Sequence, residues 1–379
     1  MNAGVFAFFF ILVGSGQWQL MSCHRVHSSD YFDPSAYIED WTLDNENETL
    51  HLPSSYLHSF GYNHSWNGYS SNEDGAKLRY YFGSRSDYKE WPLSEAHKIF
   101  SYSWYDPSKP TVIFTHGFTG FPEGLAVVSV VGFFIEEGKS NVILLNWQHL
   151  AAHVYPSFVN SYLNWAAPNA IKVGAEFAET LLNLSKTGLD LGKTHLVGHS
   201  LGAHIFGIAG NRISERGVQL PWITGLDPSS AVFDMKPAHM KLNPNSARYV
   251  SVVHSDPSKY GSSKELGLVN FWPNYRNRGP VLQPGCPAGR YARFSSEDLC
   301  SHHRCWQLLI DSYKYRGTLI GSYARSFRIW KNYSKDERNA DVLGLETYNP
   351  VAFFVCRKPG NYYLITAGKS PYGLGEDGL

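Results

Sequence analysis

The chain has 379 residues, of which 33 are lysine or arginine and 33 are aspartate or glutamate, so its formal net charge is zero. This balance gives no electrostatic case for nucleic acid or for an anionic membrane surface as a partner. The length is sufficient for a large hydrophobic core, in one big domain or in two.

An apolar run occupies residues 5–14 near the N-terminus, and small and polar residues follow it. About ten apolar residues are too few to span a bilayer, so the run predicts the core of a signal peptide. We assign residues 1–22 to this signal peptide, with cleavage between Gly16 and Cys23, and we expect a secreted, extracellular protein. No later segment of the sequence is apolar over a length that could cross a membrane.

A polar stretch follows the apolar run. Residues 24–74 hold nine acidic side chains and one basic side chain, Arg25, without a persistent helical or strand period. We expect residues 23–75 to be an acidic N-terminal leader or cap, which could be a propeptide, a loosely packed cap or a partly disordered leader. The composition becomes globular near Lys77, so residues 76–379 are expected to form the folded domain.

Short apolar runs then alternate with longer segments. We expect strands at 78–82, 110–115, 141–145, 194–197, 221–226 and 248–253, a helix at 167–184, and the last strands within 349–379. This alternation predicts an α/β fold with a mostly parallel central sheet and helices on both faces. There is no internal repeat and no second domain with its own linker.

The strand expected at 194–197 runs directly into Gly198-His199-Ser200-Leu201-Gly202, and apolar residues at helical spacing follow. This G-x-S-x-G pattern between a strand and a helix is the context that a nucleophile elbow needs. The flanking glycines permit a turn in which larger side chains would collide with the backbone. The helix N-terminus favours the negative charge that develops when Ser200 attacks a carbonyl. A glycine-rich turn with a capping serine is the alternative for the motif alone.

A serine nucleophile needs a base, and the base needs an acid that orients it. In α/β-hydrolases the order along the chain is serine, acid, histidine. Asp227 follows the strand expected at 221–226 and is the predicted acid, because such folds place their sites at the carboxyl ends of strands. Asp256, which also follows a strand, is the competing acid.

Three later histidines are candidates for the base, namely His254, His302 and His303. His302 lies between Cys300 and Cys305, and the segment would be held rigidly if both cysteines were bridged. We therefore predict that His302 is the base and keep His303 as the near alternative.

The oxyanion that forms on attack needs two backbone N–H donors. The predicted donors are Leu201, directly after the nucleophile, and Phe118, in the loop after an early strand. His116 and His199 are interpreted as residues that orient their turns, and His204 as a packed helix residue.

Five cysteines are present. If Cys23 leaves with the signal peptide or stays free, the other four can form two disulfides in three ways. Of these we favour Cys286–Cys300 and Cys305–Cys356. No spacing of cysteines and histidines suggests a metal site, and we expect no cofactor. Four N-x-S/T sequences are compatible with glycosylation in a secretory pathway; they begin at Asn47, Asn63, Asn183 and Asn332.

Eight short motifs, in order from about residue 78 onward, resemble those of the pancreatic lipase family of animal lipases. They are HGF at 116–118, VGAE at 173–176, GHSLGAH at 198–204, ITGLDP at 223–228, HSD at 254–256, FWPN at 271–274, QPGC at 283–286 and CSHHR at 300–304. The resemblance implies the α/β-hydrolase fold. It also aligns Ser200 with the family's nucleophile, Asp227 with the acid, His302 with the base, and Phe118 and Leu201 with the oxyanion donors.

The sequence departs from longer family members in three places. It ends 77 residues after His302, so we expect a single catalytic domain without the C-terminal β-sandwich, and no colipase partner. The lid segment, 287–299, has 13 residues, and the loop at 257–266 has 10. In this family, short versions of both loops accompany phospholipase A1 or galactolipid hydrolysis. The segment after FWPN is altered to NYRNRGP, which bears on the substrate and not on the triad.

These features resemble compact insect lipases, insect phospholipases A1 and the related yolk proteins. The expected function is hydrolysis of lipid carboxylic esters, by a phospholipase A1-type or triacylglycerol lipase that contacts a lipid interface peripherally. The alternative is a catalytically silent lipid- or hormone-binding protein like the yolk proteins, in which the nucleophile is lost. The sequence leaves the oligomeric state open.

Overall fold

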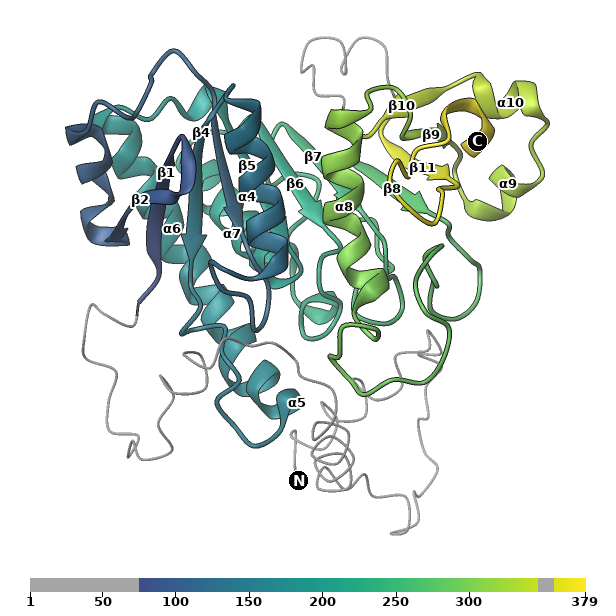
Figure 1. The fold of residues 1–379 in the computed structure, drawn as a ribbon, viewed down its shortest axis with the longest axis horizontal. Coiled ribbons are helices and arrows are strands. Elements are labelled where there is room, and N and C mark those ends of the chain that lie inside the picture. The colour runs from purple at the N-terminus through teal and green to yellow at the C-terminus, as the bar shows by residue number, and fades with distance from the viewer. Residues whose placement is uncertain (1–74, 347–357) are drawn as a thin grey trace.

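The computed structural model describes residues 75–346 and 358–379. These residues contain one sheet of eleven strands in the order β10-β9-β11-β8-β7-β6-β5-β3-β4-β1-β2 (Figure 1). The strands are β1 (Lys77–Phe82), β2 (Ser84–Pro92), β3 (Thr111–Thr115), β4 (Asn141–Asn146), β5 (Thr194–His199), β6 (Trp222–Leu226), β7 (Tyr249–Val253), β8 (Val269–Pro273), β9 (Ile320–Tyr323), β10 (Val342–Gly344) and β11 (Gly360–Leu364).

The α-helices are α4 (Leu125–Glu137), α5 (Phe158–Ser161), α6 (Ala167–Thr187), α7 (Leu201–Glu215), α8 (Cys300–Lys314), α9 (Phe327–Lys331) and α10 (Lys335–Asn339). Short 3₁₀ segments lie at Leu93–Ser101, Leu191–Lys193, Phe233–Met235, Ala238–Met240 and Gly375–Gly378, and a π-helical turn lies at Tyr162–Ala166. None of the described helices is long and apolar enough to cross a membrane.

The seven strands in the middle of the sheet pair in parallel, in the spatial order β4-β3-β5-β6-β7-β8-β11. Two antiparallel strands extend the sheet at each edge, β1 and β2 at one and β9 and β10 at the other. The inner strands β3 to β8 are buried along their whole length, as expected for parallel strands covered on both faces. The outermost strand, β2, has the sequence SRSDYKEWP and is largely exposed.

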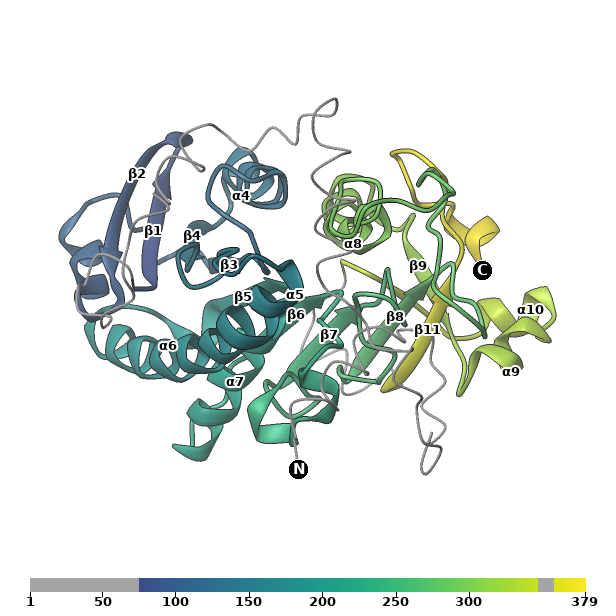
Figure 2. The same cartoon turned by 90° about the horizontal axis from the view of Figure 1, so that it is seen from below.

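Helices cover both faces of the sheet. Figure 2 shows α4 and α8 on one face and α6 and α7 on the other. Each layer encloses its own apolar core, one between the sheet and α6 and α7, the other between the sheet and α4 and α8. Helices α6 and α7 approach closely at Gly174, where an added Cβ would lie 2.9 Å from the Ile205 carbonyl oxygen. This close packing fixes the position of α7, which begins at the G-x-S-x-G motif.

The predicted α/β-hydrolase fold is confirmed, including the mostly parallel sheet and the helices on both of its faces. The six strands expected before residue 254 correspond to β1 and β3 to β7, and the helix expected at 167–184 corresponds to α6. The edge strand β2 was not expected, because its polar, exposed sequence carries no apolar period. The proposed signal peptide, the acidic leader, Cys23 and the sequons at Asn47 and Asn63 lie outside the described residues.

One of the two favoured disulfides is present. Cys286 and Cys300 are bonded, with their Cα atoms 5.7 Å apart, and the bond closes the 13-residue segment between them. Among the described residues Cys305 has no disulfide partner and is buried, so its bridge to Cys356 stays a prediction. Its sulfhydryl group donates to the His302 carbonyl oxygen at 3.1 Å, one turn back in α8. Cys356 lies outside the described residues.

Candidate active site

Ser200 occupies the sharp turn between β5 and α7. Its backbone has φ 56° and ψ −118°, a strained conformation for a residue with a side chain. The turn is held in place because the Ser200 N–H donates to the Leu226 carbonyl oxygen at 2.9 Å, and the Ser200 carbonyl oxygen accepts from the Ala203 N–H at 3.2 Å. This geometry is that of a nucleophile elbow, with the serine at the N-terminus of a helix.

The two glycines of the motif are required because any side chain at their positions would collide with neighbouring backbone. A Cβ on Gly198 would lie 2.5 Å from the Gly202 backbone, and a Cβ on Gly202 would lie 2.7 Å from the His116 carbonyl oxygen. A third glycine, Gly117, lies against the serine itself, where an added Cβ would come within 2.6 Å of the Ser200 Cβ. The His116–Gly117–Phe118 loop therefore packs directly on Ser200.

Two hydrogen bonds hold this loop beside the elbow. The Trp147 indole N–H donates to the His116 carbonyl oxygen at 3.0 Å, and the Thr119 N–H donates to the Ala151 carbonyl oxygen at 2.8 Å. Leu201 is the first residue of α7, so its N–H is one of the donors that a helix start leaves without an intrahelical acceptor. The two expected oxyanion donors, Phe118 and Leu201, thus lie on the two segments that meet at the Ser200 side chain.

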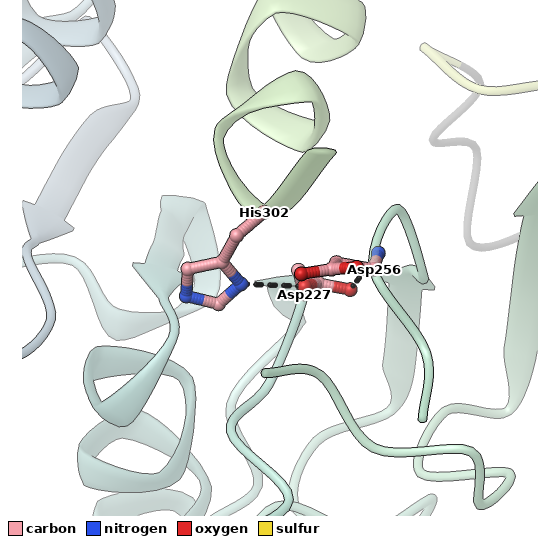
Figure 3. A group of neighbouring side chains, drawn as sticks. All are labelled: Asp227, Asp256 and His302. Carbon is pink, nitrogen blue, oxygen red and sulfur yellow. Dashed lines mark hydrogen bonds and ion pairs between the residues drawn. The ribbon is translucent and has the colours of Figure 1, made fainter. Parts of the chain in front are cut away.

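Asp227 and His302 form a buried hydrogen-bonded pair. The His302 Nδ1 lies 2.6 Å from the Asp227 Oδ2, and the two side chains are 6% and 0% exposed (Figure 3). Asp227 follows β6, and His302 lies in the first turn of α8. The second Asp227 oxygen accepts the Asp256 N–H at 2.9 Å. The acid and the base predicted from the sequence are therefore in direct contact.

The elbow and the base are joined through His199, the residue before Ser200. Its imidazole centroid lies 4.8 Å from that of His302, and its Nε2 lies 3.4 Å from the His302 carbonyl oxygen. The ring of Tyr260 packs against His302 from another direction, at 5.5 Å between centroids. The His302–Asp227 pair thus contacts the residue that directly precedes Ser200.

Asp256, the competing acid, lies beside this pair without joining it. Its carboxyl group is fully buried, and neither oxygen has a hydrogen-bond partner among the described residues. One ligand-type atom from each of Asp256, Asp227 and His302 lies within 4.8 Å of the others, a spacing that could hold a metal ion. However, His302 Nδ1 is already bonded to Asp227, so the trio is more simply a hydrogen-bonded pair with a second carboxyl beside it.

Burial sets the protonation of the cluster. It lowers the pKa of His302 to about 3, so the imidazole is neutral at neutral pH and can accept a proton. Burial raises the pKa of Asp227 well above its usual range, and N–H bonds from Asp256 and Ser255 lower it again. Burial and the charge of Asp227 both raise the pKa of Asp256.

The other candidate histidines have structural surroundings. Both ring nitrogens of His254 are bonded, to the Ser262 carbonyl oxygen and to the Asn270 side chain, each at 3.0 Å. His204 is bonded to the Ser229 carbonyl oxygen at 2.8 Å, and its ring stacks on Phe233. The His303 ring lies 6.1 Å from that of His302, and no bond to either aspartate is present among the described residues.

A second group of residues near the site was not foreseen. Lys259 and Tyr260 lie in the loop after β7. The Lys259 side chain forms an ion pair with Asp298, and the Tyr260 hydroxyl donates a hydrogen bond to it; Asp298 lies near the end of the disulfide-closed segment. Phe294, in the same segment, packs on Phe118. No local motif indicates these contacts. Lys259 and Tyr260 lie 34 to 39 residues before their partners, and Phe118 lies still further along the chain from Phe294. Only the cysteines at 286 and 300 marked the segment as constrained.

Comparison with known proteins identifies the family. A model of the lipase family matches residues 84–372. Phospholipase A1 of Vespa crabro is 31% identical over 270 residues, which are 70% of this chain and 83% of that protein. Phospholipase A1 of Vespula maculifrons is 34% identical over 218 residues, 56% of this chain and 69% of that protein.

Lipase member H-B of Xenopus laevis is 33% identical over 232 residues, 61% of this chain, and the match spans about half, 47%, of that relative. Among solved structures, an esterase of Pyrobaculum calidifontis aligns with a TM-score of 0.27 and 16% identity over 40% of this chain and 59% of that chain, a likeness too low to bear on activity. With a family model over most of its length, the chain belongs to the lipase family, as its ordered motifs predict.

Proposed function

We propose that this member of the lipase family, a lipid ester hydrolase, uses Ser200 as its nucleophile, His302 as its base and Asp227 as the acid that orients the base. The observation that carries the proposal is the buried 2.6 Å contact between His302 Nδ1 and Asp227 Oδ2, beside a strained serine elbow. This pairing fixes the tautomer of His302, because an N–H at Nδ1 leaves Nε2 as the proton acceptor.

The reaction then proceeds in two halves. His302 Nε2 takes the Ser200 hydroxyl proton while the Ser200 Oγ forms a bond to the acyl carbon. The tetrahedral intermediate collapses, the ester C–O bond breaks, and the imidazolium gives its proton to the leaving alcohol. Water, deprotonated by His302, attacks the acyl-enzyme in the same way and releases the fatty acid. Asp227 stabilises the imidazolium in both halves.

The oxyanion of each intermediate rests on the N–H groups of Phe118 and Leu201. The support is positional: Gly117 brings the first segment against the Ser200 side chain, and Leu201 begins the helix whose N-terminus favours negative charge. Because the Trp147 and Thr119 hydrogen bonds hold the first segment before substrate arrives, these donors need little rearrangement during the reaction.

The nucleophile is tested with a fluorophosphonate probe and a short-chain ester. The wild-type protein should be labelled and Ser200→Ala should not, and kcat should fall by roughly 10⁴–10⁶-fold. Ser214→Ala, on the exposed side of the same helix, is the matched control and should keep both labelling and rate. Absence of labelling in the wild type would instead favour a silent lipid- or hormone-binding protein.

For the substrate we propose a phospholipid cleaved by phospholipase A1-type chemistry, ahead of a neutral glyceride. The support is the 13-residue segment between the bonded cysteines and the 10-residue loop after Asp256, since a less covered site admits a polar headgroup. Assay of the purified protein on phosphatidylcholine and on triolein, side by side, decides the order. Turnover of triolein alone would reverse it.

We also propose that the protein is secreted and meets its substrate at a lipid surface. The disulfide fits an oxidising compartment, and the sequon residues Asn183 and Asn332 are exposed, as glycosylation requires. Leu125 and Met235, 66% and 72% exposed, follow strands β3 and β6 and offer apolar contacts for such a surface. Expression in secretory cells, followed by glycosidase treatment and vesicle co-sedimentation, tests each point.

A further inference from the structure

A cluster of aromatic rings, which we call the aromatic wall, packs against the loop that holds Phe118. It consists of Phe118, Phe158, Tyr162, Tyr260 and Phe294. The Phe118 ring contacts Phe294, Phe158 and Tyr162 at centroid distances of 5.9, 6.2 and 5.6 Å. Phe294 also stacks on Phe158 at 5.3 Å and contacts Tyr260 at 5.2 Å. Phe294 is therefore the ring that the disulfide-closed segment inserts among residues of three other segments.

The backbone of Phe294 is held in a way that fixes where its ring points. Its φ is 68°, a conformation that a residue with a side chain adopts only when its surroundings impose it. Its N–H donates to Asp298 Oδ2 at 3.0 Å and lies 3.2 Å from the Tyr260 hydroxyl oxygen. The Tyr260 hydroxyl in turn donates to Asp298, so the three residues form one closed hydrogen-bonded ring.

Lys259 completes this arrangement from the loop after β7. Its ammonium group lies 2.7 Å from Asp298 Oδ1 and 2.6 Å from the Asp298 carbonyl oxygen. The Asp298 side chain is only 12% exposed, so the ion pair is shielded from solvent more than a surface pair is. The disulfide at Cys300 anchors the segment two residues further on. The position of Phe294 is thus fixed by an ion pair, by hydrogen bonds and by the disulfide.

The side of the site on which Phe294 lies indicates which half of the substrate it meets. The leaving alcohol must lie at His302, because it receives the imidazolium proton. The Tyr260 ring contacts both His302 and Phe294. Phe294 itself packs on Phe118, whose N–H is the proposed donor to the carbonyl oxygen. The acyl chain begins at that carbonyl carbon, so the aromatic wall lies on the acyl side.

We propose that Phe294 is the residue that sets acyl-chain selection in this enzyme, by closing the acyl side of the site with its ring. The proposal rests on the proposed function and adds its chain-length determinant. A long acyl chain must displace or pass the ring, whereas a short chain reacts without touching it. The Lys259–Tyr260–Asp298 clamp determines how firmly the ring resists displacement.

The test measures kcat/KM on p-nitrophenyl acetate, butyrate, octanoate and palmitate, dispersed in the same detergent. Phe294→Ala should raise the palmitate-to-butyrate ratio of kcat/KM by about tenfold or more, the scale on which apolar pockets discriminate chain length. Phe294→Trp should lower the ratio. Asp298→Asn, which weakens the clamp, should move the ratio in the same direction as Phe294→Ala. Tyr291→Ala, an exposed ring on the same segment, is the control and should leave the ratio unchanged.

The outcomes separate the two proposals. Absence of ester hydrolysis and of fluorophosphonate labelling in the wild type overturns the proposed function. An active wild type whose chain-length ratio is unmoved by both Phe294 variants overturns this inference alone. An equal loss on all four esters also overturns it, because it assigns Phe294 to holding the machinery and not to sorting chains. Circular dichroism identifies a variant that has not folded. Phe294→Ala and Phe294→Trp change the side-chain volume in opposite directions, so each tests the inference independently of the other.

Discussion

The contact between Asp227 and His302 gives the sharpest quantitative prediction. In Asp227→Asn the 2.6 Å charge-assisted bond is lost and the amide cannot balance the imidazolium. Both side chains are buried, and His302 becomes charged only when it takes the Ser200 proton, so the ion pair with Asp227 exists in the transition state. Removing one partner of a buried ion pair costs about 3–5 kcal/mol, which here raises the barrier. At about 1.4 kcal/mol for each factor of ten, kcat/KM should fall roughly a hundredfold to several thousandfold.

Asp256→Asn is the matched comparison, because it makes the same chemical change on the neighbouring carboxyl. Neither Asp256 oxygen has a hydrogen-bond partner among the described residues, so kcat/KM should stay within about tenfold of the wild type. Initial rates on a soluble short-chain ester, at enzyme concentrations corrected by probe titration, measure both variants. A larger loss in Asp256→Asn than in Asp227→Asn would refute the assignment and make Asp256 the acid.

The remaining predictions concern the surroundings of the pair. Gly261→Ala should lower kcat at least about tenfold without unfolding, because the added Cβ would come within 2.4 Å of Asp227 Oδ1 and push the carboxylate off His302. Opening the disulfide, by Cys286→Ser with Cys300→Ser, should cost about 3 kcal/mol of unfolding free energy for a loop of this length, seen in urea titration. On the acid side of the pH profile, kcat/KM should fall only far below pH 6.5. The reason is that burial lowers the pKa of His302 to about 3, so its imidazole stays neutral and able to accept a proton until the pH approaches 3.

Each of these has a result that contradicts it. Ser263→Ala, an exposed change in the same loop as Gly261, is the control, and equal kinetics for the two variants would exclude the steric argument. A double-serine variant as stable as the wild type would mean that the segment is held by the clamp alone. An acid limb centred near pH 6.5, in the range where circular dichroism finds the protein folded, would mean that His302 is solvated in the free enzyme.

Those parts of the fold that depend on local pattern could be predicted from the sequence. Buried parallel strands are continuous apolar runs, and the residues of the elbow are adjacent in the chain, so β5 and Ser200 were both visible. The pairing of Asp227 with His302 spans 75 residues, and it was predicted from the order of residues along the chain, the cysteines on either side of His302 and the family resemblance.

Other features could not be predicted because they are made by contacts between distant segments. The Lys259–Tyr260–Asp298 clamp joins two loops whose sequences show no motif. The surroundings of Cys305 are another such feature, because a count of cysteines does not tell on which side of a helix each one lies. In the structure, Cys305 is on the inner side of α8, fully buried, with its sulfhydryl group against the helix backbone.

The polar edge strand β2 has a consequence for the whole molecule. An outermost strand offers unpaired backbone groups to any other strand, including one from a second copy. Here that position holds Ser84–Pro92, a segment in which charged side chains such as Arg85, Asp87 and Lys89 are exposed and a proline closes the end. Such a sequence opposes strand-to-strand aggregation, so the sheet that the described residues form can end at β2 without pairing with a strand of another molecule.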